Sequence, residues 1–303
     1  MNEKYRPSVI RPGDHEAWLA ERDKGIGASE VAAVVGLSPW DTPFSLWLRK
    51  TGQIPRPEET QAMKMGHLLE PVVVQLWEME TGFKAVKSSA ADIIYFDPEH
   101  PWRRVTPDRI AYETMWLKKR KVLLEIKTTS KDIDPCDIPK NYLCQCQYQM
   151  HVTGVHVCYL CWLTNGRYYG SARLEYDEEF ATWLAGEVDD FYNRCIIGGE
   201  EPLCIQASDF QLKGAEEGKA IEADSEALED LKELRTIKTS INDLEGQEDS
   251  LTDKIKMYMQ DAEALTLEGE TLATWKEGKK GRTFLLKNKK IEEFLMQQEN
   301  EFE

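Results

Sequence analysis

The spacing of hydrophobic and polar residues changes several times along the chain. From Trp18 to about Cys204, helical patterns with apolar residues every three or four positions alternate with short strand patterns rich in Val, Tyr and Trp. This alternation predicts an α/β or α+β domain in residues 1–205, with a central mixed sheet flanked by helices. Glycines and charged residues then interrupt the periodicity, so we interpret residues 206–223 as a linker.

A further segment, residues 224–303, opens with a long helical pattern that Asp224 can cap. Its apolar positions alternate steps of three and four residues and form a coiled-coil-like stripe, interrupted by Glu248. The stripe consists of Leu234, Ile237, Ile241, Leu244, Leu251, Ile255 and Tyr258. Two interpretations remain open for it: packing against another helix of this chain, or a surface for a partner protein.

The pattern changes to a period of two after Ala262. Residues 265–267 and 271–276 alternate in this way on either side of Glu268-Gly-Glu, which predicts a β-hairpin. A basic turn at residues 278–282 then precedes another short strand and a final helix. The segment is therefore expected to be an acidic extension built from a helix and a hairpin.

The composition adds an expectation about the compartment in which the protein is found. The chain has 303 residues, of which 41% are hydrophobic, and this is enough for a full core and a smaller appendage. No apolar run approaches the roughly 20 residues that span a bilayer, and residues 1–12 lack the apolar region of a signal peptide. We expect a folded protein of the cytoplasm with no membrane partner.

The seven cysteines are an odd number without an export signal, which argues against a disulfide framework. Five of them lie between Cys136 and Cys161, so an iron–sulfur or zinc site is the alternative to simple buried thiols. Cys158 and Cys161 are three residues apart in a strand-like segment, which points their side chains to opposite faces. We therefore interpret the cysteines as small buried hydrophobic residues.

The candidate chemistry lies in two strand-like segments. Pro107-Asp108 ends the first, and Glu125-Ile126-Lys127 lies in the second, with Glu125 seventeen positions after Asp108. Because strand side chains alternate, Glu125 and Lys127 point to the same face, and Asp108 can reach the same space.

Such a group meets the needs of phosphodiester hydrolysis, which requires a hydroxide, a cation that lowers the pKa of its parent water, and positive charge near the phosphate. Two carboxylates are ligands that suit Mg²⁺, with Mn²⁺ as the alternative. Asp108 and Glu125 are the candidate ligands, and the backbone carbonyl of Ile126 can complete the protein's share. Lys127 would orient the attacking water and favour its deprotonated form.

These residues resemble the PD-(D/E)xK nuclease signature, and three further motifs narrow the resemblance to the YqaJ-type viral recombinases, relatives of lambda exonuclease. The first runs from Trp18 to Trp40 and contains Arg22, Gly27 and Ser29; the second is Gly66-His-Leu-Leu-Glu70-Pro; the last is the glutamine-bearing Cys144-Gln-Cys-Gln147-Tyr-Gln-Met-His151. With Pro107-Asp108 and Glu125-Ile-Lys127 they follow the family order between about Asp14 and Pro202. The acidic extension resembles one seen in this family.

The resemblance implies a restriction-endonuclease-like core and adds roles to individual residues. It implies that Glu70, at a helix start, lies beside the metal site and that Gln147 contacts a phosphate or the nucleophilic water. It also implies that Arg22 contacts the 5′-terminal phosphate. A related nuclease group carries Tyr four residues after the glutamine, where this chain has His151, which we interpret as a structural histidine.

DNA binding has to be reconciled with a formal net charge of −16, because phosphate contacts need Lys and Arg. Gly25 and Gly27 allow a tight turn into a helix whose first amides could bind a phosphate together with Arg22 and Ser29, although Ser29 could simply cap that helix. Further local positive charge is expected close to the catalytic strands. Its candidate sources are Arg103, Arg104, Arg109, Lys131 and the run Lys118-Lys-Arg-Lys121, whose alternative is a solvated turn.

By this resemblance, the protein is a 5′-to-3′ exonuclease that acts on double-stranded DNA ends and leaves 3′ overhangs for recombination. A homo-oligomer, commonly a trimeric ring, and a single-strand annealing protein as partner are implied in the same way. Two alternatives stay open: another nuclease of this fold, such as a repair or restriction endonuclease, or a DNA-end-binding protein whose catalytic residues are unused.

Overall fold

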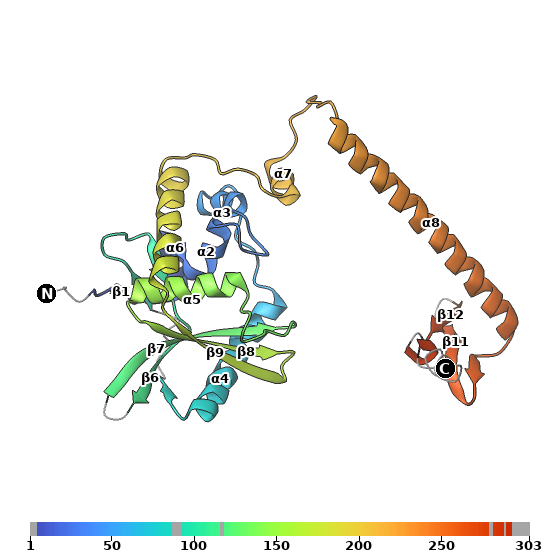
Figure 1. The fold of residues 1–303 in the computed structure, drawn as a ribbon, viewed down its shortest axis with the longest axis horizontal. Coiled ribbons are helices and arrows are strands. Elements are labelled where there is room, and N and C mark those ends of the chain that lie inside the picture. The colour runs from blue at the N-terminus through green and yellow to red at the C-terminus, as the bar shows by residue number, and fades with distance from the viewer. Residues whose placement is uncertain (1–4, 87–92, 116–117, 279–280, 288, 293–303) are drawn as a thin grey trace. The chain divides into compact units, whose positions relative to one another are not determined.

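The computed structural model describes the chain except for residues 1–4, 87–92, 116–117, 279–280, 288 and 293–303 (Figure 1). The chain divides into two compact units, Met1–Glu217 and Gly218–Glu303. Within the described part, no helix combines the length and the apolar character needed to cross a membrane.

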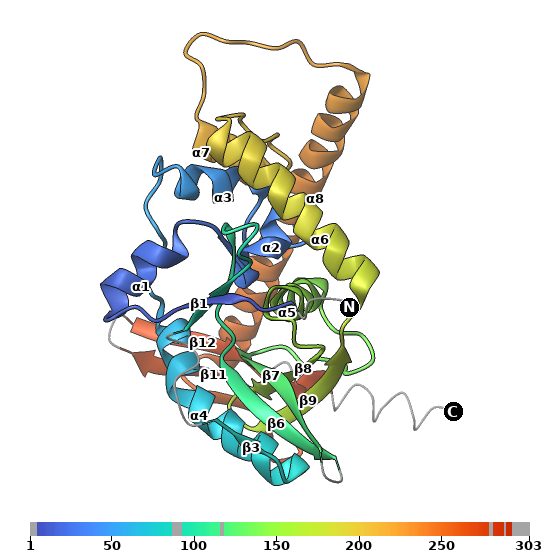
Figure 2. The same ribbon diagram turned by 90° about the vertical axis from the view of Figure 1, so that its left-hand side faces the viewer.

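A five-stranded mixed sheet forms the centre of the first unit. Its strand order is β3-β6-β7-β8-β9, with β7 and β8 parallel and the other neighbours antiparallel. The strands are β3 (Lys84–Ala85), β6 (Arg109–Met115), β7 (Lys118–Thr129), β8 (Val157–Thr164) and β9 (Tyr168–Glu175). Figure 2 shows the long antiparallel pair β6 and β7 beside helix α4 (Gln61–Thr81). The predicted class, a mixed sheet flanked by helices, is confirmed.

Two hydrophobic cores cover the two faces of this sheet because its central strands are apolar on both sides. Every residue of β8 is buried, as expected for a central strand with a parallel neighbour. One core lies between the sheet and α4, where Val73 and Trp77 meet Val122 and Leu124. The other lies under α5 (Lys140–Thr153), on the opposite face of the sheet (Figure 1).

The remaining helices of the first unit complete the layer around α5. Helices α2 and α6 pack against α5, and α3 packs against α2. They are α1 (His15–Arg22), α2 (Ala28–Val34), α3 (Pro43–Lys50), α6 (Glu178–Phe191), the π-helical turn η2 (Tyr192–Ile197) and α7 (Ala207–Lys213). Helix α7 lies within residues 206–223, which the sequence pattern indicated as a linker. Its Asp209 is buried and accepts a hydrogen bond of 2.6 Å from Thr42, so this part of the predicted linker is packed structure.

A smaller four-stranded sheet of order β1-β4-β5-β2 positions the segment before α2. Its strands are β1 (Ser8–Ile10), β2 (Ile26–Gly27), β4 (Ile94–Phe96) and β5 (Arg103–Val105). The backbone approaches so closely here that a Cβ atom on Gly25 would lie 2.1 Å from the carbonyl oxygen of Trp102. Glycine is therefore required at Gly25.

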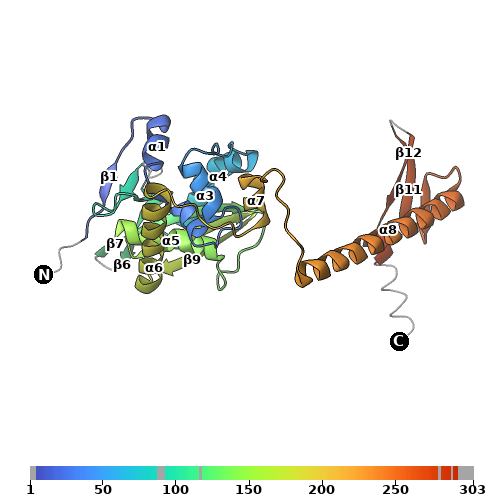
Figure 3. The same cartoon turned by 90° about the horizontal axis from the view of Figure 1, so that it is seen from above.

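The second unit contains the long helix α8 (Ser225–Met259), capped by Asp224 as expected, and a three-stranded antiparallel sheet (Figure 3). Its strands are β10 (Ala264–Leu267), β11 (Glu270–Gly278) and β12 (Gly281–Leu286). Glu268 and Gly269 join β10 to β11 with φ values of 51° and 85°, as a tight hairpin turn requires. The predicted hairpin is confirmed, and at the end of α8 Met259 is buried.

The cysteines are thiols, most of them buried in the first unit. Cys158 and Cys161 belong to the cores on opposite faces of the sheet, as their spacing predicted. Among the residues that the structure describes, no group of three or more His, Cys, Asp or Glu side chains is arranged to hold a metal ion. The interpretation of these cysteines as buried hydrophobic residues agrees with both observations.

Candidate active site

Asp108 lies directly before β6, at the point where the antiparallel pairing of β6 with β7 ends. The last paired residues are Arg109 and Leu124. The next inward-pointing amide of β7, that of Ile126, donates a hydrogen bond of 2.7 Å to Oδ2 of Asp108. The Asp108 carboxylate thus takes the place of a strand partner and is fixed beside β7.

Glu125 and Lys127 project from β7 toward α5, as the alternation of the strand predicted. Glu125 is 2% exposed, and Nζ of Lys127 lies 2.6 Å from its Oε1. Ile126, between them, packs against the core on the opposite face. The structure therefore brings Asp108, Glu125 and Lys127 together.

Lys127 is held in its charged form. Burial lowers the pKa of this ammonium, but the nearby carboxylates of Glu125 and Asp108 outweigh burial and raise it overall. Lys127 also lies over the ring of Tyr142, 5.3 Å from its centroid, an arrangement that favours the cation. The group supplies a fixed positive charge next to two carboxylates.

The surroundings that favour the charged form of Lys127 disfavour the charged form of Asp108. Burial raises the pKa of this carboxyl well above its usual range, and the charges of Glu125 and Glu70 add to the increase. Only Lys127 and the Ile126 amide oppose it among the principal causes. The positive charge of Lys127 therefore does not fully balance the negative charge around Asp108. A bound divalent cation would offset the remainder.

Glu70 lies in the interior of α4, not at a helix start as the resemblance implied, because the helix begins nine residues earlier at Gln61. Burial raises the pKa of Glu70 in spite of the Arg109 guanidinium, with which it forms an ion pair. Arg109 was expected to contact DNA, but its side chain is engaged by Glu70 and by the carbonyl of Asp108. Glu70 thus stands close to the cluster, as expected, with Arg109 as its counterion.

The donor set fits a hard divalent cation. In a strand, the N–H and C=O of one residue point to the same side, so the Ile126 carbonyl faces the side of Asp108, where no strand pairs with it. Asp108, Glu125 and this carbonyl would be three oxygen ligands, and waters would fill the remaining positions that Mg²⁺ requires.

The glutamines of α5 differ from the expectation. Gln147 points away from the cluster: its amide donates to the carbonyl of Glu175 at 2.8 Å and accepts from the amide of Asp177 at 2.9 Å. The residues that reach Glu125 are Gln145, at 2.6 Å from Oε1, and Gln149, at 2.7 Å from Oε2. A four-residue step places Gln145 and Gln149 on one helix face, while Gln147 faces elsewhere. This spacing was the available signal for the two glutamines.

Arg22 and Ser29 meet at the start of α2, as the sequence predicted. Arg22 donates a hydrogen bond of 2.9 Å to Oγ of Ser29. The N-cap position of α2 is Gly27, whose amide donates to the Glu30 carboxylate at 2.7 Å, so Ser29 is not the capping residue. Arg22 and Ser29 form a polar pair at the exposed start of the motif.

Other cations expected near the site have different positions. Arg103 forms ion pairs with Asp97 and Asp189, and Arg104 pairs with Glu21, so neither contributes free positive charge. The run from Lys118 to Lys121 forms the beginning of β7 rather than a loop. Lys131 is exposed just beyond the end of β7.

His151 contacts the hydroxyl of Tyr176 at 2.9 Å, and burial lowers the pKa of His151, consistent with a structural histidine.

Comparison with known proteins gives a family and several similar structures. Residues 17–156 match the family model of the YqaJ-like viral recombinase domain. The uncharacterized protein YqaJ of Bacillus subtilis (strain 168) is 32% identical over 274 residues, which cover 86% of this chain and 83% of that protein. The aligned length exceeds the first unit, so the similarity extends into the second.

Two of the similar solved structures carry exonuclease names. The alkaline exonuclease LHK-Exo from Laribacter hongkongensis is 21% identical, with a TM-score of 0.47 and coverage of 61% of this chain and 94% of that chain. A phage related exonuclease from Haemophilus somnus 129PT is 11% identical, with a TM-score of 0.40 and coverage of 58% and 96%.

Proposed function

Because this chain belongs to the family of YqaJ-like viral recombinase domains, we propose that it is a metal-dependent deoxyribonuclease that digests linear double-stranded DNA from its 5′ ends. The product would be a 3′ single-stranded overhang of the kind used in phage-type homologous recombination. The observation that carries this proposal is the convergence of Asp108, Glu125 and Lys127 at the point where β6 begins.

The residues of the chain divide the work of hydrolysis among them. Asp108, Glu125 and the Ile126 carbonyl would hold Mg²⁺, with Mn²⁺ as the alternative, and the bound ion would lower the pKa of a water and offset charge on the phosphate. Lys127, held as a cation by Glu125 and Asp108, orients the attacking water. The water loses a proton to solvent and its oxygen forms a bond to phosphorus, while the bond from phosphorus to the leaving oxygen breaks and that oxygen takes up a proton from solvent.

Gln145 and Gln149 keep the Glu125 carboxylate in a single orientation through both of its oxygens. Such hydrogen bonds from neighbouring groups orient metal-ligating carboxylates. These two glutamines are therefore positioning residues for Glu125, whereas the resemblance implied that Gln147 contacts a phosphate or the nucleophilic water.

Arg22 and Ser29 are the proposed contact for the 5′-terminal phosphate. Their pairing at 2.9 Å leaves the remaining guanidinium N–H groups of Arg22 for a phosphate. Lys131, exposed beyond the end of β7, is a further proposed DNA contact. We also propose a homo-oligomer, of the trimeric kind expected for the family, and a single-strand annealing protein as partner.

The test uses purified full-length protein and DNA labelled separately on each strand and at each end. Linear duplex, closed circular duplex and linear single strands are incubated with Mg²⁺, and the products are resolved over time. The proposal predicts loss of the strand labelled at 5′ ends and an intact circle. Cutting of the circle would instead indicate an endonuclease of this fold, and binding to ends without any digestion would indicate an end-binding protein.

A further inference from the structure

Helix α8 presents an apolar face that its own unit leaves exposed over most of its length. The exposed fractions are 48% for Leu234, 48% for Ile237, 47% for Ile241, 63% for Leu244 and 58% for Leu251. By contrast, Met259 at the end of the helix is 4% exposed, because the sheet of the second unit lies there. Five large aliphatic side chains on one helix face are costly to leave in water.

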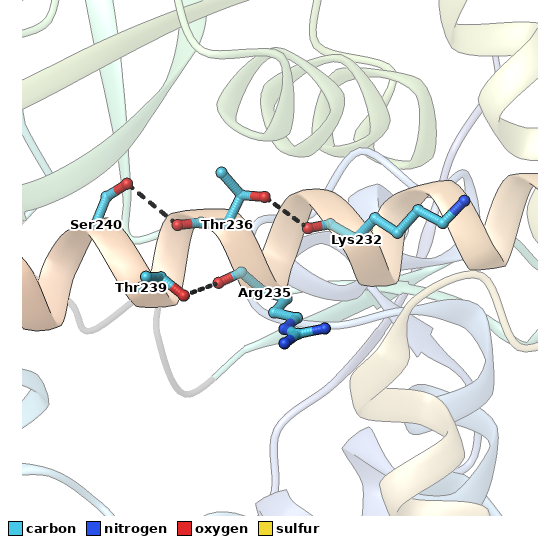
Figure 4. Close-up of a pocket in the computed structure, with 5 residues that line it drawn as sticks. All are labelled: Lys232, Arg235, Thr236, Thr239 and Ser240. Carbon is cyan, nitrogen blue, oxygen red and sulfur yellow. Dashed lines mark hydrogen bonds between the residues drawn. The ribbon is translucent and has the colours of Figure 1, made fainter.

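The opposite face of α8 is polar and shows which side of the helix is suited to docking. Lys232, Arg235, Thr236, Thr239 and Ser240 line a shallow hollow on that face (Figure 4). The three hydroxyls donate to backbone carbonyls four residues earlier, at 3.0, 3.0 and 3.1 Å. The three hydroxyls already have hydrogen-bond partners within the helix, and this face is hydrophilic. A partner would therefore bind the apolar side alone.

The apolar face has a spacing that reads the same in both directions. Before Ile255, which is only partly exposed, the positions of this face are 234, 237, 241, 244, 248 and 251. They alternate steps of three and four residues, as in helices that pair along a coiled-coil seam. The midpoint of this series lies between Asn242 and Asp243. Turning a second copy around this midpoint superimposes the seam on itself, with Ile241 opposite Leu244 of the other copy.

We propose that α8 binds α8 of a second copy of this chain in antiparallel orientation, centred between Asn242 and Asp243. In this arrangement the residues that flank the seam are complementary. Lys238 and Glu245 of the other copy lie on the same flank of the seam, within two positions of the same height, and Glu233 and Lys254 are neighbours in the same way on the other flank. The two-fold symmetry forms each pair twice. Neither Lys238 nor Glu245 forms an ion pair with another described residue of its own chain.

A parallel pair of the same helices is less favourable for two reasons. It matches Glu233 with Lys238 but places Glu245 opposite Ser240, so fewer opposite charges meet. It also places Glu248 of one copy against Glu248 of the other inside the seam, where like charges repel. The antiparallel pair keeps these two carboxylates apart, with each Glu248 opposite Ile237.

The test is a charge exchange in the full-length protein under reducing conditions, with the mass measured by sedimentation equilibrium over a range of concentrations. Lys238→Glu alone and Glu245→Lys alone each make two like-charge contacts and are expected to weaken association by about tenfold. The double variant Lys238→Glu/Glu245→Lys restores both contacts and is expected to regain most of the affinity. In a parallel pair the double variant would stay weak, because Glu233 would face a second glutamate.

Matched controls carry the same charge changes on the outer side of the helix. Lys232→Glu and Asp249→Lys are expected to leave association unchanged. Ile241→Asp, in the centre of the seam, is expected to halve the mass of the assembly, including one that also forms through the first unit, while circular dichroism shows that the helix persists. A mass that Ile241→Asp does not change, or a double variant no tighter than the single ones, would overturn the proposal; the face would then be covered by another part of the chain or by a different protein.

Discussion

The backbone amide of Ile126 donates a hydrogen bond of 2.7 Å to the carboxylate of Asp108. This contact joins the residue directly before β6 to the residue that lies between Glu125 and Lys127. It leaves the other carboxylate oxygen of Asp108 and the Ile126 carbonyl on the same side of β7. The geometry of the candidate metal site follows from this single link between two strands.

The charge of Asp108 predicts an effect of pH on the stability of the metal-free protein. Burial and the neighbouring Glu125 raise the pKa of Asp108 in the folded state, so ionising it costs stability as the pH rises through that raised pKa. Asp108→Asn removes this cost and is expected to raise the metal-free Tm by about 2–4 °C at pH 8. The gain should shrink as the pH falls below the raised pKa, where the wild-type carboxyl is already protonated.

The same measurement with Mg²⁺ separates this effect from metal binding. Adding Mg²⁺ should raise the Tm of the wild type more at pH 8 than at pH 5.5, because the ion binds the ionised carboxylates. Asp108→Asn should show almost no Mg²⁺ effect. An equal Mg²⁺ shift in both proteins would remove Asp108 from the ligand set.

Gln149 and Gln147 are predicted to have different roles although both are buried. Gln149→Ala removes the hydrogen bond to Oε2 of Glu125, and nuclease activity is expected to fall by about 10- to 100-fold. Gln147→Ala removes contacts to Glu175 and Asp177, and is expected to lower stability by about 1–3 kcal/mol with activity per folded molecule retained. Rates normalised to folded protein, together with denaturant titrations, check both; a larger loss of activity for Gln147→Ala would restore the role implied by resemblance.

Arg22 is predicted to act on the DNA end. Arg22→Ala should abolish a preference for 5′-phosphorylated over 5′-hydroxyl duplexes, because the group that pairs with Ser29 at 2.9 Å is the proposed phosphate contact. The measurement compares initial rates on the two substrates for wild type and variant. Arg120→Ala removes a half-buried cation near the far end of β7 that pairs with Glu175; it is the control and should keep the preference. A preference that survives in Arg22→Ala would place the phosphate elsewhere.

Trp77 is predicted to be a main source of stability on the α4 side of the sheet. It is 0% exposed and meets Tyr159 edge to face, with ring centroids 5.3 Å apart. Trp77→Ala should lower the free energy of unfolding by about 3–5 kcal/mol. On the same helix, Met79 is 81% exposed, and Met79→Ala should change it by less than about 0.5 kcal/mol. Urea titrations distinguish the two, and similar effects would contradict the assigned core.

Sequence reasoning predicted the parts of the site that depend on local periodicity. Strand alternation was sufficient to place Glu125 and Lys127 on one face and Ile126 on the other. It was also sufficient for the opposite directions of Cys158 and Cys161. These features survive in the fold because both faces of the central strands are buried, which fixes their register.

The features of the site that depend on tertiary contacts could not be predicted from the sequence. The counterions of Arg103 and Arg109 are Asp189 and Glu70, which lie far away in the chain. The sequence therefore did not show that these two arginines are neutralised. The family resemblance implied a helix start at Glu70, but α4 begins at Gln61 and continues through Pro71. The packing of Val73 and Trp77 offsets the cost of an internal proline.

Strand digestion by Lys127→Ala tests most directly whether Asp108, Glu125 and Lys127 form a nuclease active site. Linear 5′-phosphorylated duplex is incubated with Mg²⁺, and the rate is measured beside DNA-end binding for the wild type, the variant and the exposed control Lys140→Ala. A loss of at least about 100-fold is expected for Lys127→Ala with end binding retained, and no loss for Lys140→Ala. Digestion by Lys127→Ala at the wild-type rate would contradict this expectation.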